Sequence, residues 1–547
     1  MFCNDEQDSL EPISDRTGVQ FLTGDMVSHT FGIERKNKDF SVATSRTGTS
    51  KDSRSDKTFS DSEATSDRTP MINSEVAAEA FTESQRKRVK TTALVYAAAI
   101  LERADEQILP AVYMFVGQSL RCSPSQLGTI TLARAIVQAL TSPISGVLGD
   151  RYDRAYVISA GCCIWGLMTS GLGLSFSLQM AMFFSAWNGL GLSLVIPSCQ
   201  SLVADYYDAN DRGKAFGVLY MMCAIGGLCG GVAATNLGGL VILGMEGWRF
   251  FYQCVGALSL LCGLAVARFA VDPRFVPGSS QRPAEGRSSL WPETLSIFQL
   301  RSFQVILAQG IVGSMPWFCV GYLTLWFQLL GFSDFQASLL MAIFSLANAA
   351  GSFLGGVLGD LAERWSPDHG RILVAQVSVI SGPPLSYVLL KVLPEAAGLS
   401  VWAFSAVLLA MGVLISWCAA ACNNPVFASI VPEHLRSMIF AYDRCLEGGI
   451  AAMITPVVGI IAEEVFHYTT PPPDVEPTAQ VQKDNARALG DAIVVTFIIP
   501  WLLCFGFYSL LHFVYKRDRD LATAGNYKRV ASRSGPGADE WRGQDSA

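Results

Sequence analysis

Long apolar runs follow one another along this chain from about residue 92 to about residue 515. A membrane-spanning helix needs about 20 mainly apolar residues, and about 12 runs meet that requirement. Charged residues make up only 16% of the 547 residues, against about 25% in soluble domains. We therefore predict an all-α, multi-pass membrane protein with spans near 92–116, 126–148, 156–176, 178–203, 213–243, 250–271, 302–330, 336–360, 371–391, 399–430, 436–465 and 491–515.

Polar segments divide these runs into two groups of six. Residues 1–90 are rich in Ser, Thr, Asp, Lys and Arg, a composition typical of a disordered tail. We expect one six-helix bundle over 91–271, a linker over 272–301, a second six-helix bundle over 302–516 and a disordered tail over 517–547. Lys and Arg gather at the ends of spans that would share one side with both termini, so both termini are predicted to be cytosolic.

A charged motif between two apolar runs occurs twice. The stretch GVLGDRYDR (Gly146–Arg154) recurs as GVLGDLAER (Gly356–Arg364), each time after the second run of its half. Duplicated halves are typical of secondary transporters, whose substrate site lies at the interface between the repeats. The sequence therefore predicts two related bundles around a central site.

The first copy of this motif resembles the loop signature of the major facilitator superfamily. Asp205 together with the run from Arg212 to Gly217 resembles the connection between the fourth and fifth helices of that family. The resemblance covers residues 91 to about 519 and implies a monomeric transporter that works by alternating access, without a cofactor.

The stretch ERADEQILPAVY of the first span resembles a group of plant and algal relatives, and two further details resemble the Spinster-like branch of the family. They are Tyr152 within the motif and the pair Glu102-Arg103 in the first span. That branch is associated with sphingolipids and lysophospholipids, with proton coupling proposed. Where it carries an Arg and a Glu on its fourth helix, this chain has Ser185 and Leu192.

The duplicated loops are predicted to form a cytosolic gate. Glycines let neighbouring helices approach closely, while Asp and Arg side chains can bond helix ends across the interface between the halves. Such a gate would hold the cytosolic side shut in one state and release it in the other. The alternative is that the charges only set the topology. The predicted gating residues are Gly146, Gly149, Asp150, Arg151, Asp153, Arg154, Asp205, Arg212, Gly356, Asp360, Glu363, Arg364 and Arg436.

Four charged residues lie inside the first span, at Glu102, Arg103, Asp105 and Glu106. Each costs about 2.5–3.5 kcal/mol near the bilayer centre on insertion scales, so they require partners or a wet cavity. Arg103 and Glu106 are three residues apart, which allows an ion pair, and Arg134 on the second span is a further candidate cation. We predict that these groups line the central cavity and that Asp105, or else Glu102 or Glu106, carries a proton. The alternative is a static network that fixes helix register.

The eleventh span adds a second charged cluster, consisting of Asp443, Arg444 and Glu447. For this cluster, a functional role and a position near the cytosol are both open. Gln138 and Trp317 are further candidates for the cavity wall, although buried polar residues often bond a neighbouring helix and aromatic residues often pack at the membrane interface.

These observations predict a secondary active transporter of a small organic solute or an amphiphile, coupled to protons. A sensor that keeps a transporter fold but passes little solute is the main alternative, and a lysophospholipid or sphingolipid is the alternative substrate. No nucleophile–base pair, nucleotide loop or metal spacing is present in the sequence, so we expect no enzyme activity, no metal and no nucleic-acid partner. The lipid bilayer is the expected surrounding, and the plasma membrane and endomembranes are equally compatible.

Overall fold

The computed structural model describes residues 69–207, 209–275, 297–396, 400–431, 436–470 and 478–523. The chain divides into two units, Met1–Val89 and Lys90–Ala547. In the first unit, the described residues form the first part of helix α2 (Thr69–Ala111). Most of both predicted tails and of the predicted linker lies outside the described residues, and the account below concerns the second unit.

The first half of the second unit is helical except for one short hairpin. Strands β1 and β2 pair antiparallel, with Val241 opposite Glu246 and Ile242 opposite Met245. The elements, after α2, are α3 (Tyr113–Leu120), α4 (Pro124–Arg151), α5 (Arg154–Gly173), α6 (Leu178–Tyr206), α7 (Ala209–Gly238), β1 (Val241–Ile242), β2 (Met245–Glu246), α8 (Gly247–Phe269) and the 3₁₀ turn η1 (Pro273–Phe275).

The second half is also helical, with three short π-helical segments, η3, η4 and η6. Its elements are α10 (Arg301–Cys319), the 3₁₀ turn η2 (Val320–Tyr322), α11 (Leu323–Leu330), α12 (Asp334–Trp365), α13 (Gly370–Tyr387), η3 (Val388–Val392), α14 (Leu393–Ala396), α15 (Val401–Ile415), η4 (Ala419–Asn423), α16 (Asn424–Ile430), α17 (Arg436–Ala451), α18 (Ile454–Ile460), η6 (Ile461–Val465) and α19 (Ala479–Thr523).

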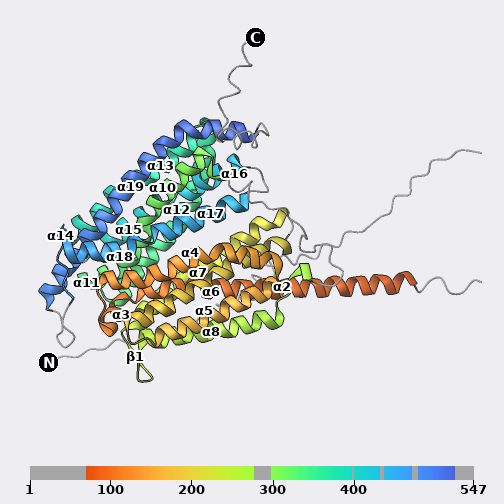
Figure 1. The fold of residues 1–547 in the computed structure, drawn as a ribbon, viewed down its shortest axis with the longest axis horizontal. Helices are drawn as coiled ribbons and strands as arrows, with labels where there is room; N and C mark the ends of the chain where they lie inside the picture. The colour runs from red at the N-terminus through yellow and green to blue at the C-terminus, as the bar shows by residue number, and fades with distance from the viewer. Residues whose placement is uncertain are drawn as a thin grey trace, which may run out of the picture. The chain divides into compact units, whose positions relative to one another are not determined.

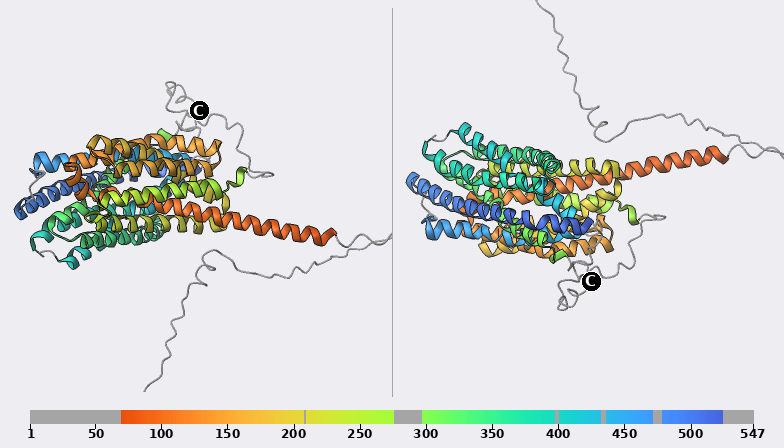
Figure 2. Two further views of the ribbon diagram at one scale, coloured as in Figure 1. Left: turned by 90° about the horizontal axis from the view of Figure 1, so that it is seen from below. Right: turned by 90° about the horizontal axis from the view of Figure 1, so that it is seen from above.

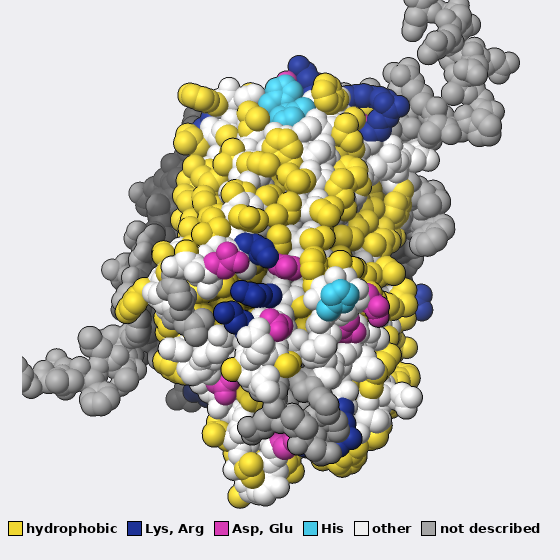
Figure 3. Space-filling view, turned by 90° about the vertical axis from the view of Figure 1, so that its left-hand side faces the viewer, with side chains coloured by type: hydrophobic (Ala, Val, Ile, Leu, Met, Phe, Trp, Pro, Cys, Tyr) yellow, Lys and Arg dark blue, Asp and Glu magenta, His cyan; other side chains and the backbone are white. Residues whose placement is uncertain are grey.

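Eleven helical segments among the described residues are long and apolar enough to cross a membrane. The predicted first span lies in α2 and α3, and its four charges set it apart from those eleven. Large apolar side chains lie on the outside of these segments, for example Phe353, 78% exposed, and Phe513, 83% exposed. Figure 3 shows a broad hydrophobic surface with charged side chains gathered above and below it. This distribution fits a surface that contacts lipid.

The helices form two bundles. In Figure 1, the helices from α2 to α8 lie together, and those from α10 to α19 lie together beside them. We call these sets the N-terminal and the C-terminal bundle. In the first, α5 packs between α6 and α8, and in the second, α19 packs on α10 and α13. In Figure 1 the helices of the C-terminal bundle run obliquely to those of the N-terminal bundle, while in the two views of Figure 2 both sets extend along the long axis of the picture. The bundles meet where α4 packs on α17 and α18 and where α7 packs on α12.

The two bundles repeat the same local devices. Ser123 and Gln126 form a capping box at the start of α4, and Ser333 and Gln336 form the same box at the start of α12. A capping box satisfies two free backbone N–H groups reciprocally and fixes where a helix begins. The preceding helices end on left-handed residues, Arg121 with φ 56° and Gly331 with φ 102°. The repeat seen in the loop motif therefore extends over the helix that precedes it.

Candidate functional site

A cavity of about 760 Å³ lies between the two bundles. From the N-terminal bundle its wall includes residues of α2, α3, α4 and α7, and from the C-terminal bundle residues of α10, η2, α11, α12 and α17. A site at this position contacts both halves of the repeat, as the sequence predicts for a transporter.

Three charged residues of the N-terminal bundle line the cavity, namely Arg103, Glu106 and Arg134. Arg103 is ion-paired with Glu106 on the same face of α2. Arg134 is only 8% exposed, and its Nη1 donates to the backbone oxygen of Glu106 at 3.3 Å. The structure therefore brings together three of the five charged side chains predicted for this wall.

The other two, Glu102 and Asp105, are not among the residues that line the cavity. The Asp105 carboxylate accepts hydrogen bonds from Thr169 (2.6 Å) and Asn188 (3.0 Å) of the neighbouring helices α5 and α6. The Glu102 side chain is 2% exposed and lies 3.6 Å from Nε of Arg103, while its Oε2 has no hydrogen-bond partner. Both carboxyls thus lie inside the N-terminal bundle.

Helix α17 supplies the charges of the opposite wall. Arg444 and Glu447 line the cavity, and the hydroxyl of Ser314 on α10 donates to the Glu447 carboxylate. Asp443 lies one helical turn before Glu447, and its Oδ1 is buried without a hydrogen-bond partner. The second predicted cluster therefore lies in the interior of the protein, with Asp443 behind the cavity wall.

Neutral side chains complete the wall. Gln138 and Trp317, the two neutral residues that the sequence suggested for the cavity wall, both line the cavity. The ring centroids of Trp317 and Phe344 lie 6.3 Å apart. Tyr113 also lines the cavity, with its hydroxyl 2.5 Å from that of Thr131. The cavity thus combines charged groups with an aromatic patch.

Contacts between the bundles seal one end of the cavity. The Tyr322 hydroxyl of the C-terminal bundle lies 2.8 Å from the backbone oxygens of Pro124 and Thr455. Gly128 allows this approach, because a Cβ atom there would lie 2.4 Å from the Tyr322 hydroxyl oxygen. Asn236 on α7 donates to Ser338 on α12 at 2.8 Å. We call this end, opposite the duplicated loops, the sealed end.

A further pair at the sealed end joins a carboxylate to a helix terminus. Glu463 in η6 accepts hydrogen bonds from the backbone N–H (2.8 Å) and the hydroxyl (2.9 Å) of Ser125, the second residue of α4. Unpaired N–H groups and the helix dipole make such a terminus favourable for an anion.

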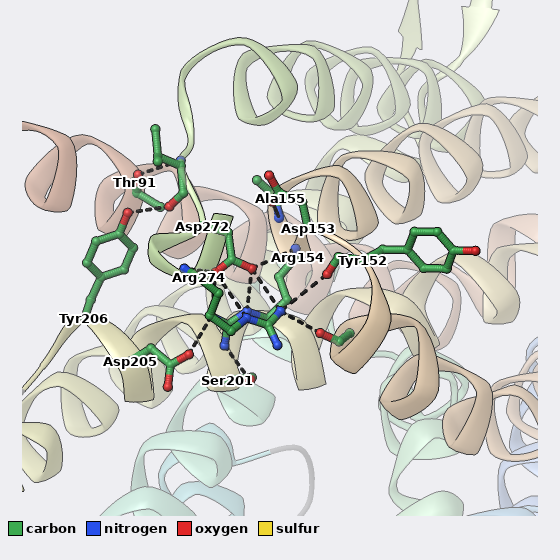
Figure 4. Close-up of polar contacts among 12 residues, drawn as sticks. Thr91, Tyr152, Asp153, Arg154, Ala155, Ser201, Asp205, Tyr206, Asp272 and Arg274 are labelled. Carbon is green, nitrogen blue, oxygen red and sulfur yellow. Dashed lines mark hydrogen bonds and ion pairs between the residues drawn. The ribbon is translucent and has the colours of Figure 1, made fainter. Parts of the chain in front are cut away.

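Arg154 is the centre of an ion-pair cluster at the other end, the motif end (Figure 4). Its side chain is 1% exposed and donates to both oxygens of Asp272, at 2.7 and 2.8 Å. It also donates to Asp205 (2.6 Å) and Ser201 (2.7 Å) of α6. Arg274 bonds Asp272 as well, and reaches the backbone oxygen of Gly149 at 2.7 Å. These partners lie on α4 and α6 of the N-terminal bundle or in the segment that directly follows α8.

The remaining residues of the first loop differ in role. Asp153 caps α5 by accepting from the N–H of Ala155 at 2.8 Å, and burial raises the pKa of this carboxyl. Arg151 is exposed. Side-chain positions at Gly146, Asp150, Arg212 and Arg436 lie outside the described part of the chain.

In the second loop, Arg371 takes the position that Arg154 has in the first. It lies at the start of α13 and donates to Asp360 (2.6 Å), Glu363 (2.7 Å) and the backbone oxygen of Ala421 (3.0 Å). Arg364, the sequence counterpart of Arg154, is exposed. Helix α12 continues to Trp365 and α13 begins only at Gly370. The arginine near the start of α13 is therefore Arg371 and not Arg364.

The glycines of the two loops also differ from the prediction in their surroundings. A Cβ at Gly149 or Gly356 would meet its nearest neighbour at 3.8 Å, an ordinary contact. At Gly359 it would lie 2.8 Å from Cα of Ala421. The close approach of helices in the second loop therefore occurs at Gly359.

Sequence reasoning missed Asp272, Arg274 and Arg371. Asp272 and Arg274 stand where the sixth apolar run gives way to the linker, in the stretch VDPRF. An acid and a base directly after a span are a usable signal for an ion pair near its end. Which loop arginine they would meet depends on how the helices pack, which no local pattern states.

Comparisons with known proteins agree with this architecture. Residues 95–456 match the family model described as Major Facilitator Superfamily. The 3-(3-hydroxy-phenyl)propionate transporter of Escherichia coli (strain K12) is 21% identical over 284 residues, covering 51% of this chain and 66% of that protein. Protein spinster homolog 1 of Rattus norvegicus is 23% identical over 233 residues, covering 42% of each chain.

Among solved structures, a bacterial homologue of the human lysosomal transporter Spinster, in an inward-facing and unoccupied conformation, has a similar fold. The TM-score is 0.67 at 19% identity, over 79% of this chain and 98% of that one. The aligned parts of the two curated relatives span less than two thirds of their own lengths. The family match covers well over half of this chain, and the chain is therefore a multi-pass membrane protein of the Major Facilitator Superfamily.

Proposed function

We propose that this protein moves a small organic solute across its membrane by alternating access and that proton movement drives the transport. The observation that carries the proposal is the cavity of about 760 Å³, because both bundles line it and charged side chains of both face it. Sites for small molecules have volumes of about 300–1,000 Å³. Charges within a membrane are costly and mark the pathways of substrates and ions.

Alternating access requires that one end of the cavity seals while the other opens. Tyr322, Asn236 and Glu463 join the bundles at the sealed end, whereas the ion pairs of Arg154 and Arg371 at the motif end each stay within one bundle. Within the part of the chain that the structure describes, this asymmetry supports a state in which the motif end is the open one. In the opposite state the exposed Arg151 is our candidate for the contact that closes the gate.

The carboxyl pair on α17 is our candidate for the proton site. Glu447 lines the cavity and Asp443 lies one turn away with a buried, unpartnered oxygen. Two neighbouring carboxyls in a low-dielectric interior are costly to ionise together, so one proton is shared between them. Asp105, which the sequence favours, has its carboxylate bonded by Thr169 and Asn188 outside the cavity wall, an arrangement that suits a role in helix register.

The test is transport in proteoliposomes that contain a pH-sensitive dye. The probes are 3-(3-hydroxyphenyl)propionate, dopamine, D-xylose and a lysophosphatidylcholine, each radiolabelled and each tested with and without an imposed proton gradient. We expect at least one probe to accumulate with the gradient and to move protons with it. Replacing Glu447 with glutamine should abolish accumulation while leaving exchange of the probe across the membrane.

The matched control is Glu395→Gln, because Glu395 is exposed and is not part of the cavity wall. It should transport like the unmodified protein. Accumulation that ignores the proton gradient would contradict proton coupling. A probe that binds and changes the conformation without any flux would favour the sensor.

A further inference from the structure

We propose that the cavity binds an organic anion whose acidic group lies between Arg134 of one bundle and Arg444 of the other. The apolar body of that anion would lie against Trp317 and Phe344. This inference rests on the proposed transport function and specifies its substrate class. It starts from the balance of charges on the cavity wall.

Cations outnumber anions on that wall. Arg103, Arg134 and Arg444 line it, against the carboxylates of Glu106 and Glu447. Glu106 is ion-paired with Arg103, and Glu447 accepts a hydrogen bond from Ser314. The protein's own carboxylates on the wall therefore leave one positive charge in excess.

Arg134 carries much of this excess. Its guanidinium is nine-tenths buried, yet its hydrogen bond is to a backbone oxygen, at 3.3 Å. Among the residues that the structure describes, no carboxylate forms an ion pair with Arg134. Burying a charge without a salt-bridge partner costs free energy. An anionic group bound in the cavity would therefore stabilise the Arg134 guanidinium.

Arg444 provides the second cation from the opposite wall. Its side chain is exposed toward the cavity, and within the described part of the chain it has neither an ion pair nor a hydrogen bond. Arg134 of α4 and Arg444 of α17 line the same cavity from the two bundles. Arginine presents a planar fork of donors that matches a carboxylate, sulfonate or phosphate group.

The neutral part of the wall suits an apolar or aromatic body. The rings of Trp317 and Phe344 lie 6.3 Å apart, and both come from the C-terminal bundle. A solute with an acidic head and an aromatic body would therefore match both parts of the wall.

An anion held in this way would also couple substrate to proton. Glu447 shares α17 with Asp443 and Arg444, while α10 presents the neutral Ser314, α4 presents Arg134 across the cavity and α19 presents the thiol of Cys504. A proton on Glu447 removes one negative charge from the wall, so the excess of positive charge grows and the anion binds more tightly. Binding and protonation then favour each other by the same factor.

The test uses three probes that differ mainly in charge: 3-phenylpropionate, its neutral amide and 3-phenylpropylamine. Binding to the purified full-length protein is measured by isothermal titration calorimetry. We expect the carboxylate to bind about 10- to 100-fold more tightly than the amide or the amine, the range of one or two charge-assisted hydrogen bonds. Arg134→Gln and Arg444→Gln should each remove that preference.

Arg134→Lys keeps the buried charge and should retain part of the preference, which separates loss of binding from loss of folding. Arg268→Gln is the matched control, because Arg268 is exposed and is not part of the cavity wall. Equal binding of all three probes, or no binding of the carboxylate up to about 10 mM, would overturn the anion site. Carboxylate binding without flux would instead refute the transport function, and proton-driven flux of xylose alone would refute only the anion site.

Discussion

Glu463 is the residue whose substitution most directly tests whether contacts at the sealed end set the balance between two states. Its carboxylate accepts two hydrogen bonds from Ser125, at 2.8 and 2.9 Å, across the interface between the bundles. Because Ser125 is the second residue of α4, the carboxylate caps the positive end of a helix in the other bundle. Glu463→Gln keeps the size of the side chain and removes its charge.

The expected size of the effect follows from these contacts. A hydrogen bond to a charged group contributes about 1.5–3 kcal/mol, and a charge at a helix terminus about 0.3–1 kcal/mol. Glutamine keeps one acceptor oxygen but turns its NH₂ group toward the other donor, so one bond and the charge are lost. For this part-buried contact we expect a loss of about 2 kcal/mol, or about a 30-fold shift toward the state in which this end is open.

The assay is single-molecule fluorescence energy transfer between Leu243 and Lys483, which belong to different bundles. Leu243 is 90% exposed in the β1–β2 hairpin, and Lys483 is exposed near the start of α19. Dyes are attached through unnatural amino acids, because thirteen cysteines among the described residues are free and would compete for thiol labels. Glu464→Gln, at the exposed neighbouring residue, is the control. An unchanged distance distribution in Glu463→Gln, or the same shift in both variants, would refute this reasoning.

Three further substitutions test other parts of the structure. Arg154→Gln removes the positive charge from its buried pair with Asp272, which should cost about 3–5 kcal/mol; thermal unfolding in detergent checks this, and an unchanged Tm would contradict it. Glu246 lies outside the spans, and although burial opposes its ionisation, hydrogen bonds from neighbouring Ser, Arg and Trp side chains lower the pKa of Glu246. Its contribution to stability is therefore present above the unfolded pKa of about 4.3 and lost as pH falls through the folded value, so Glu246→Gln should flatten the acid side of a Tm-against-pH curve. Asp105→Asn turns an NH₂ group toward a buried donor and should cost about 1–3 kcal/mol of stability. Proton movement into proteoliposomes should persist in this variant. If a folded Asp105→Asn variant moves no protons, Asp105 is the proton site instead of the pair on α17.

The all-α fold and the family are confirmed predictions, because they depend on features that sequence patterns carry directly. Apolar runs define spans by length and composition alone, and the family match and the similar solved structure agree with them. The count of twelve spans stays a prediction, since the charged first span differs from the eleven apolar ones. The domain boundaries likewise stay a prediction, because the linker is largely outside the described residues.

The direction of side chains is what local sequence could not supply. Arg103, Glu106, Gln107 and Pro110 line the cavity, and their spacing marks one face of a helix. Glu102 and Asp105, three residues apart, lie on the adjacent face of the helix and do not line the cavity. The rotation of α2 about its axis therefore decides which charged side chains reach the cavity. Packing against α5 and α6 sets that rotation. Thr169 on α5 and Asn188 on α6 donate hydrogen bonds to the carboxylate of Asp105.

The repeat also explains how a duplicated scaffold can hold an asymmetric solute. The capping boxes of α4 and α12 place equivalent residues at equivalent depths, and counting from them, Arg134 corresponds to Phe344 and Gln138 to Asn348. All four line the cavity. The repeat thus places two pairs of matching positions on the cavity wall, one polar in both bundles (Gln138 and Asn348) and the other a cation in one bundle and an aromatic ring in the other (Arg134 and Phe344). A solute with one charged end and one apolar end binds such a wall in a single orientation, which a symmetric cavity could not impose.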